Sequence, residues 1–164
     1  MSRRQRPGVF YDGSHVILTG PEFKDGVIQA DICGVGERDF QGIIFRASPA
    51  ALTSRDFQGE VVYFRPYYAN NETPHYPAIQ YFASQVDAEG RRLFAGLEKD
   101  VPIPKDAWFH VRIEVRGKEA KMFLGEGREP ALVVPNLASG RNSGLVGFWG
   151  WNGRLANLKL TPAN

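Results

Sequence analysis

Hydrophobic and polar residues alternate with a period of two along much of the chain, which is the pattern of β-strands buried on one face. The clearest example is WFHVRIEV, residues 108–115, in which the odd-numbered positions are apolar and the even-numbered positions after Trp108 are polar or charged. The run GIIFRA, residues 42–47, is mostly apolar, so we expect a central strand that is buried along most of its length. No segment predicts a helix of three turns.

Turn signals such as Asp25-Gly26 and Glu89-Gly90 divide the chain into short segments of this kind. Asn152-Gly153 is the strongest short hairpin signal, and it predicts that residues 145–151 fold back onto residues 155–160. We expect about eleven or twelve strands, among them 9–11, 15–19, 27–33, 42–47, 61–65, 93–94, 108–115, 120–124, 131–134, 145–151 and 155–160. This series predicts an all-β fold, an antiparallel two-sheet sandwich or jelly roll.

Length and composition fit one domain that spans residues 1–164, with the basic residues 1–8 as a frayed terminus. A net charge of +2 gives no reason to expect a nucleic-acid partner. The single cysteine, Cys33, excludes a disulfide within the chain and a cysteine-rich metal site.

No stretch approaches about 20 consecutive apolar residues, so we expect no membrane span. The first residues, MSRRQRPG, are not followed by the apolar run of a signal peptide. The sequence as written therefore predicts a cytoplasmic protein, and a trimmed leader would make it secreted or periplasmic. Nothing in the sequence indicates an oligomeric state.

The stretch of residues 59–82 holds the best candidates for a binding site. Alternation places Tyr63 and Arg65 on one face of its first strand. Arg46 lies near the end of the preceding strand, and if the two strands are neighbours the two guanidiniums share one surface. Arginine donates well to sugar hydroxyls, carboxylates or sulfates. The alternative is that both arginines pair with Asp or Glu across the sheet.

Aromatic and polar side chains extend this candidate site. Trp149 shares a strand face with Trp151, and an exposed indole is a platform for a sugar ring, although tryptophan is more often a packing residue. His75 lies in a loop, where it would serve as an acid or base if a pocket forms there. The candidate ligand-binding residues are Arg46, Tyr63, Arg65, Tyr67, Asn70, His75, Gln80, Tyr81 and Trp149. No Ser-His-Asp or Cys-His spacing and no phosphate-binding loop is present, so we expect no catalytic residue.

Several segments together resemble a known family. They are DGVIQADI, QGIIFRA, VVYFRPYYAN, IPKDAWFHVRIEVRGKEAKMFLG, ALVVPNL and GLVGFWGWNGRLANLKL, which cover most of residues 22–160. This series resembles the concanavalin A-like lectin/glucanase jelly roll, and more narrowly the laminin-G-like and 3-keto-disaccharide-hydrolase-related domains of bacteria. One departure is Phe40-Gln41, where the family often has Asn-Ser before the glycine.

The resemblance implies a two-sheet sandwich with a concave face that holds the ligand. The glucanase branch carries Glu-x-Asp-x-x-Glu on a strand, because two carboxylates must flank the scissile bond. Glu37-Arg38-Asp39 and Glu98-Lys99-Asp100 are near matches that lack the third carboxylate, so glucanase chemistry is not expected. Many such jelly rolls bind a structural calcium at the rim, and the oxygen ligands here would be Asp12, Asp25 and Asp31, although no dense acidic loop is present.

Three functions remain open at this point. The first is a non-catalytic, lectin-like module that binds a carbohydrate or another small polar ligand on the concave face. The second is a glycoside hydrolase or lyase similar to the 3-keto-disaccharide hydrolases, which would need a pair of carboxylates, or one with His75, facing the arginines. The third is a protein-interaction domain whose aromatic residues are buried at an interface.

Overall fold

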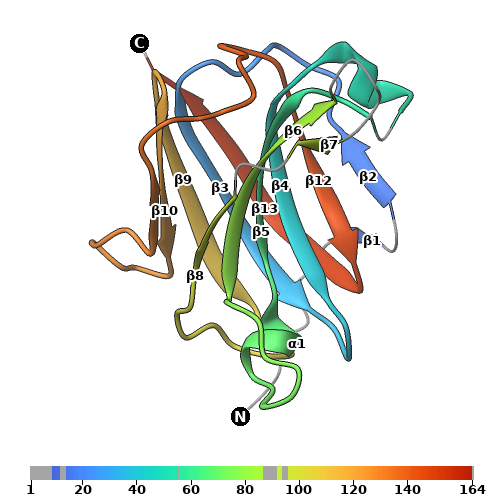
Figure 1. Cartoon of the computed structure of the whole chain (residues 1–164), viewed down its shortest axis with the longest axis vertical. Helices are drawn as coiled ribbons and strands as arrows, with labels where there is room; N and C mark the ends of the chain where they lie inside the picture. Colours follow the sequence, from blue (N-terminus) through green and yellow to red (C-terminus); the bar gives the residue numbers. More distant parts are fainter. Residues whose placement is uncertain (1–8, 12–13, 55, 87–91, 94–95, 164) are drawn as a thin grey trace.

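The computed structural model describes residues 9–11, 14–54, 56–86, 92–93 and 96–163. Their strands form two antiparallel sheets packed face to face (Figure 1). Sheet A has the order β1 (Val9–Tyr11), β13 (Gly153–Pro162), β3 (Gly26–Gly34), β9 (Phe109–Arg116), β10 (Glu119–Leu124) and β11 (Leu132–Val134). Sheet B has the order β2 (Ser14–Ile17), β12 (Leu145–Trp151), β4 (Phe40–Ala47), β5 (Gly59–Phe64), β6 (Ile79–Val86) and β7 (Arg92–Leu93), and β8 (Gly96–Lys99) also pairs with β6. The expected all-β sandwich is confirmed.

The main core lies between the two sheets and is built by the alternation of each strand. Phe109, Val111 and Ile113 of β9 point into it, and the residues between them point out of sheet A. Val62 and Phe64 of β5 enter the same core from sheet B. Each large apolar side chain that is fully buried in this way stabilises the fold by about 1.5–3 kcal/mol.

A second apolar layer covers the outer face of sheet B. Ile44, Val61 and Phe82 point away from the main core and pack with Phe57 of the segment between β4 and β5. That segment contains the short 3-10 helix η1 (Pro49–Leu52) and is tied to the sheet by a hydrogen bond from Ser84 Oγ to the Phe57 carbonyl at 2.8 Å. Strand β4 is therefore covered on both faces, as its apolar run predicts.

The prediction of a hairpin at Asn152-Gly153 is wrong. A tight turn does form there, with Asn152 at φ 52°, but β12 lies in sheet B and β13 lies in sheet A. Both edges of β12 pair with β2 and β4, so the turn carries the chain from one sheet to the other. A Cβ on Gly153 would lie 1.6 Å from Gln41 Oε1, which shows how closely the chain approaches sheet B at this crossing.

Other boundaries follow the sequence pattern more closely. The turn at Gly117 joins β9 to β10, with Arg116 opposite Glu119. Strand β6 was missed because Phe82 on its outer face breaks the polar-apolar alternation, and the four-residue strand β8 was missed as well. The turn expected at Glu89-Gly90 lies outside the described residues. Among the described residues, the α-helix α1 (Pro66–Ala69) is a single turn, and no helix has the length and apolar content needed to cross a membrane.

Candidate functional site

Two large aromatic side chains meet on the outer face of sheet B because a glycine separates them. Gly42 of β4 is paired with Trp149 of β12 on one side and with Tyr63 of β5 on the other. A Cβ at Gly42 would lie 3.1 Å from the Trp149 ring and 3.3 Å from Tyr63 Cβ. The missing side chain lets the two rings pack edge to face, with their centroids 5.5 Å apart.

A small groove extends from Trp149 along this face, and we refer to it as the aromatic groove. It has a volume of about 130 Å³ and is lined by His15, Phe57, Val61, Phe82, Ser84, Trp149 and Trp151. Trp151 lies two residues after Trp149, so both indoles lie on the same face, with ring centroids 6.2 Å apart. Trp151 is 40% exposed, which leaves one of its surfaces available to a ligand.

Polar side chains gather around Arg65 beside the aromatic groove, and we refer to them as the Arg65 cluster. Tyr63, Gln80 and Glu98 lie side by side on β5, β6 and β8, as the strand register requires. Arg65 Nη2 donates to Tyr63 Oη at 2.6 Å, to Glu98 Oε1 at 3.0 Å and to Gln80 Oε1. The guanidinium also lies 4.9 Å from the Tyr63 ring centroid and 5.5 Å from that of Tyr76.

Tyr63 connects the aromatic groove with the Arg65 cluster. Its ring packs against Trp149 on one side, and its hydroxyl accepts from Arg65 on the other. Burial raises the pKa of Tyr63 above its usual value of 10.0, so the side chain is a neutral phenol at physiological pH. The face therefore presents one continuous surface with flat aromatic rings at one end and fixed hydrogen-bonding groups at the other.

Four of the nine candidate residues come together on this face: Tyr63, Arg65, Gln80 and Trp149. The prediction that Arg46 and Arg65 share one surface is wrong. Strands β4 and β5 are neighbours, but they are antiparallel, so the two arginines lie at opposite ends of the pair. The alternative of pairing across the sheet holds for Arg65, which pairs with Glu98 of sheet B, whereas Arg46 pairs with Asp25, directly before β3 of sheet A.

Arg46 is also inaccessible to a ligand, because it is only 2% exposed. Its Nε donates to the Lys24 carbonyl at 2.9 Å, and its Nη2 donates to Asp25 Oδ1 and to the Gly117 carbonyl, both at 2.8 Å. Its backbone has a left-handed φ of 51°, which breaks the alternation at the end of β4. Arg46 therefore ties the start of β3 and the β9–β10 turn to sheet B.

The prediction that Tyr81 binds the ligand is also wrong. This side chain faces the core and is only 1% exposed. It shares the inner face of β6 with Ile79 and Ala83. Its hydroxyl donates to Glu60 Oε2 at 2.7 Å and accepts the Ala138 N–H at 2.8 Å. Burial and the nearby Glu60 carboxylate raise the pKa of Tyr81, which remains a neutral donor inside the protein.

Three candidates lie around α1 and the loop that follows it. Asn70 Nδ2 donates to the carbonyls of Pro66 and Ile103 at 2.7 and 3.0 Å, so its amide donors hold the loop. His75 Nε2 lies 2.8 Å from Asp100 Oδ2, and this hydrogen bond raises the pKa of His75 above 6.5. The Tyr67 ring lies 4.8 Å from Lys105 Nζ. The binding roles of these three residues stay predictions.

The three acidic residues expected as calcium ligands do not suit that role where they are described. Asp25 Oδ1 accepts from Arg46 and from the Gly117 N–H, and Asp31 accepts from His110 and Asn157. At about 3.3 Å per residue, six residues of extended chain separate these two carboxylates by about 20 Å. Asp12 lies outside the described residues, within which no group of three or more His, Cys, Asp or Glu could hold a metal ion.

Several residues of this face were not among the candidates predicted from the sequence. The alternation that places Trp149 outside also places Trp151 there, so this residue belongs with the candidates. His15 and Glu98 come from segments far from residues 59–65 in sequence, and only the pairing of β2 and β8 with sheet B brings them near. Phe57 lies just before β5, and its packing with Ile44, Val61 and Phe82 places it on the same face.

Among the comparisons with known proteins, only the solved structures show a likeness, and it concerns the fold. No protein-family model and no curated protein sequence matches the chain. Among solved structures it is similar to carbohydrate binding module CBM66 from Bacillus subtilis, with 14% identity and a TM-score of 0.62 over 93% of this chain and 90% of that one. Lactose- and MES-liganded congerin II has 15% identity and a TM-score of 0.62 over 90% of this chain and 100% of that one. Caenorhabditis elegans galectin LEC-6 has 11% identity and a TM-score of 0.62 over 98% and 99%. The chain therefore has the lectin-like β-sandwich fold of these proteins.

Proposed function

We propose that this protein is a non-catalytic carbohydrate-binding module whose ligand lies on the outer face of sheet B. The observation that carries the proposal is the continuity of the aromatic groove and the Arg65 cluster through Tyr63. A pyranose ring has an apolar face of C–H groups and an edge of hydroxyls, so it fits a site with stacking rings beside fixed donors and acceptors. The shared fold with a carbohydrate binding module and with a lactose-liganded protein supports this ligand class.

The residues of this face take different roles in the proposal. Trp151, which is 40% exposed, stacks on the sugar ring, and Trp149 packs against the Trp151 ring from the side. The Glu98 side chain is 41% exposed and accepts hydrogen bonds from sugar hydroxyls. The Arg65 side chain is only 9% exposed, so it is a positioning residue that holds Glu98 and Gln80 in fixed places.

Binding without catalysis suits this face better than hydrolysis does. A glycosidase needs two carboxyl groups that flank the scissile bond, about 5–5.5 Å apart in a retaining enzyme and about 6.5–9.5 Å apart in an inverting one. Of the residues described for the aromatic groove and the Arg65 cluster, only Glu98 carries a carboxylate. The relation to 3-keto-disaccharide hydrolases stays a prediction from the sequence.

The test is a glycan-array screen of the full chain, followed by calorimetric titration with the oligosaccharides that bind. Trp151→Ala removes a stacking surface, and Glu98→Gln replaces a charged acceptor with an amide. Each change is expected to weaken binding about tenfold, since a stacking contact or a hydrogen bond to a charged group is worth about 1–2 kcal/mol.

Matched controls exist on sheet A. Glu119→Gln changes an exposed glutamate that is paired with Lys121 at 3.1 Å, and Val133→Ala trims an apolar side chain that is 38% exposed. Both controls should bind as the wild type does. If the wild type binds no glycan, or if every oligosaccharide gives the wild-type titration curve with both Trp151→Ala and Glu98→Gln, the proposal fails.

A further inference from the structure

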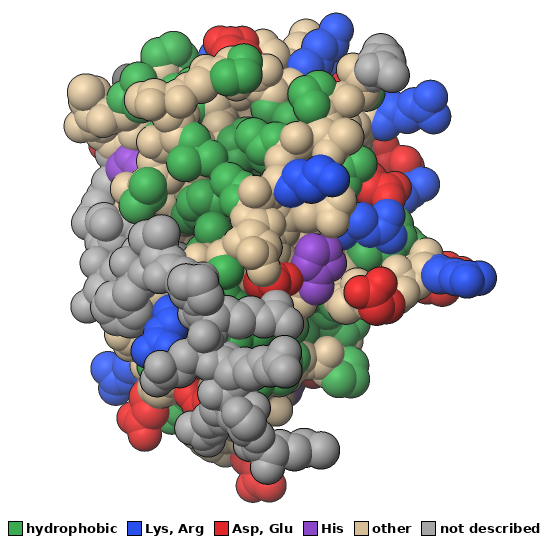
Figure 2. Space-filling model, turned by 180° about the vertical axis from the view of Figure 1, so that it is seen from behind, with side chains coloured by type: hydrophobic (Ala, Val, Ile, Leu, Met, Phe, Trp, Pro, Cys, Tyr) green, Lys and Arg blue, Asp and Glu red, His purple; other side chains and the backbone are tan. Residues whose placement is uncertain are grey.

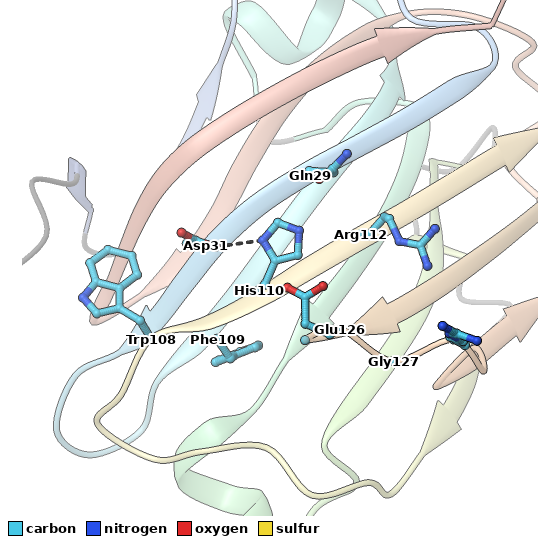
Figure 3. Close-up of a pocket in the computed structure, with 10 residues that line it drawn as sticks. Gln29, Asp31, Trp108, Phe109, His110, Arg112, Glu126 and Gly127 are labelled. Atoms are coloured by element: carbon cyan, nitrogen blue, oxygen red, sulfur yellow. Dashed lines mark hydrogen bonds and ion pairs between the residues drawn. The ribbon is translucent and has the colours of Figure 1, made fainter.

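A second hollow lies on the opposite side of the molecule, on the outer face of sheet A (Figure 3). It has a volume of about 560 Å³ and is lined by Gln29, Asp31, Trp108, Phe109, His110, Arg112 and residues 125–128. This volume lies within the range of about 300–1,000 Å³ that is typical of small-molecule sites. Figure 2, viewed from the side opposite to Figure 1, shows acidic, basic and histidine side chains next to one another. The hollow shares no residue with the aromatic groove or the Arg65 cluster.

The base of the hollow is built around Asp31, which is 6% exposed. Asp31 of β3 and His110 of β9 are directly opposite in the strand register, and His110 Nδ1 lies 2.8 Å from Asp31 Oδ1. Asn157 Nδ2 donates to the other oxygen, Oδ2, at 2.7 Å. Asn157 reaches Asp31 from β13 because its φ of 52° falls in a register irregularity between Ala156 and Lys159.

These contacts fix the orientation of the His110 ring. An ionised Asp31 accepts a hydrogen bond from Nδ1–H, so the neutral imidazole presents Nε2 as an acceptor on the side away from Asp31. The His110 side chain is 32% exposed, which leaves it accessible from the hollow. A histidine that is held by a buried carboxylate has little rotational freedom to lose when it binds a ligand.

The walls of the hollow are fixed as well. Arg112 follows His110 on the same face of β9, where its guanidinium lies 3.9 Å from the Phe123 ring centroid and contacts Glu114. The N–H of Gly125 donates to the His110 carbonyl at 2.9 Å and anchors the loop that carries Glu126. Figure 3 shows the Glu126 carboxylate next to His110 and Arg112, and Trp108 at the end of the hollow.

The lining contains both hydrogen-bond donors and acceptors. Arg112 offers donors, Glu126 and the Nε2 of His110 offer acceptors, and the Gln29 amide offers both. An anion would be repelled by Glu126 and a cation would be repelled by Arg112, whereas each hydroxyl of a sugar both donates and accepts a hydrogen bond. The indole of Trp108 adds a flat apolar surface at one end. We propose that this hollow is a second saccharide site, which takes a neutral, hydroxyl-rich mono- or disaccharide unit.

A second site on the opposite sheet would make the protein bivalent. Ligands on the two outer faces point in opposite directions, so one molecule would bridge two glycan chains or engage two parts of one polymer. This inference rests on the geometry of sheet A and stands whether or not the aromatic groove of sheet B binds sugar.

The three tryptophans of the chain give each site its own reporter, since Trp108 lies at the hollow and Trp149 and Trp151 lie at the aromatic groove. Each neutral oligosaccharide that binds the 164-residue chain on a glycan array is titrated into the ¹⁵N-labelled protein. The indole N–H signals are then followed by NMR, with Trp108→Phe used to assign the first. At least one oligosaccharide is expected to shift the Trp108 signal with a saturable dependence on concentration.

Substitutions separate the hollow from the groove. His110→Ala and, separately, Glu126→Gln should weaken the binding that Trp108 reports about three- to tenfold, the effect of losing one hydrogen bond. Glu119→Gln and Val133→Ala, which lie on sheet A but outside the hollow, should leave that binding unchanged. Glu126 is an exposed loop residue, so its variant tests the site even if His110→Ala disturbs the sheet.

The outcomes distinguish this inference from the proposed function. Shifts confined to Trp149 and Trp151 overturn the second site and leave the proposed function intact. Shifts confined to Trp108 support the second site and overturn the assignment of the ligand to sheet B. An array without any bound neutral glycan, or Trp108 shifts that survive both His110→Ala and Glu126→Gln, also overturns the second site.

Discussion

Asp39, directly before β4, is a fully buried carboxyl group, and its replacement by asparagine should change how stability depends on pH. Its Oδ1 accepts the Tyr67 N–H at 2.7 Å, while no described group hydrogen-bonds its Oδ2. The pKa of Asp39 is raised from 3.8 to about 6, mainly by burial and also by the charge of Asp106, while the Tyr67 hydrogen bond and Lys105 act in the opposite direction.

The pKa difference sets the sign and the size of the effect. The folded state binds this proton more tightly than the unfolded state, so the stabilisation is complete below pH 3.8 and is lost as the pH rises through about 6. A difference of about 2 pKa units corresponds to about 3 kcal/mol of unfolding free energy. An asparagine at this position would keep the Oδ1 acceptor but could not ionise. The unfolding free energy of Asp39→Asn minus that of the wild type should therefore increase by about 2–3 kcal/mol from pH 4 to pH 8.

The assay is urea unfolding of both proteins, followed by tryptophan fluorescence at several pH values between 4 and 8. The constant cost of burying the new amide cancels, because the prediction concerns only the change of the difference with pH. Val133→Ala, which trims an exposed apolar side chain and changes no titratable group, serves as the control and should show a flat difference over the same range. A flat profile for Asp39→Asn would refute the account, since it would mean that Asp39 titrates like an exposed carboxyl.

Further predictions test residues whose roles the structure reassigned or left open. Arg46→Met should cost about 3 kcal/mol of stability in urea unfolding, because the buried guanidinium donates to Asp25 and to the carbonyls of Lys24 and Gly117; a loss of glycan affinity in the folded variant would contradict its purely structural role. Tyr81→Phe should cost about 2 kcal/mol, because the buried Glu60 carboxylate loses a donor; an unchanged urea midpoint would count against this network. In an NMR titration His75 should show a pKa above 6.5, and Asp100→Asn should lower it; an unaltered His75 titration in that variant would rule out Asp100 as the cause.

The sequence was most informative where a property depends on one strand alone. Alternation in residues 108–115 separated the core-facing residues of β9 from the outward-facing ones, and it placed Trp149 and Trp151 on one face. It failed at Arg46, where a left-handed backbone residue at the end of β4 changes the direction of the side chain. No feature of the residues around Arg46 indicates that change.

The candidate sites depended much more on tertiary structure. Arg65 was identified from its strand, but its partner Glu98 reaches it only because β8 pairs with β6. The hollow on sheet A was not expected at all, since alternation placed His110 on the polar face of its strand without indicating a neighbour. Its partner Asp31 lies 79 residues away from it in sequence, and Asn157 lies 126 residues away from Asp31.

The sequence by itself determined the all-β class, most strand positions and which side chains of a strand share a face. The physical reason is that the pleat alternates side chains locally, whatever the strand pairs with. Only the tertiary structure decided that Asn152-Gly153 crosses between sheets, that Arg46 and Tyr81 are buried, and that two separate polar surfaces form. These features depend on which strands become neighbours and in what register, and that choice is made by the packing of the whole sandwich.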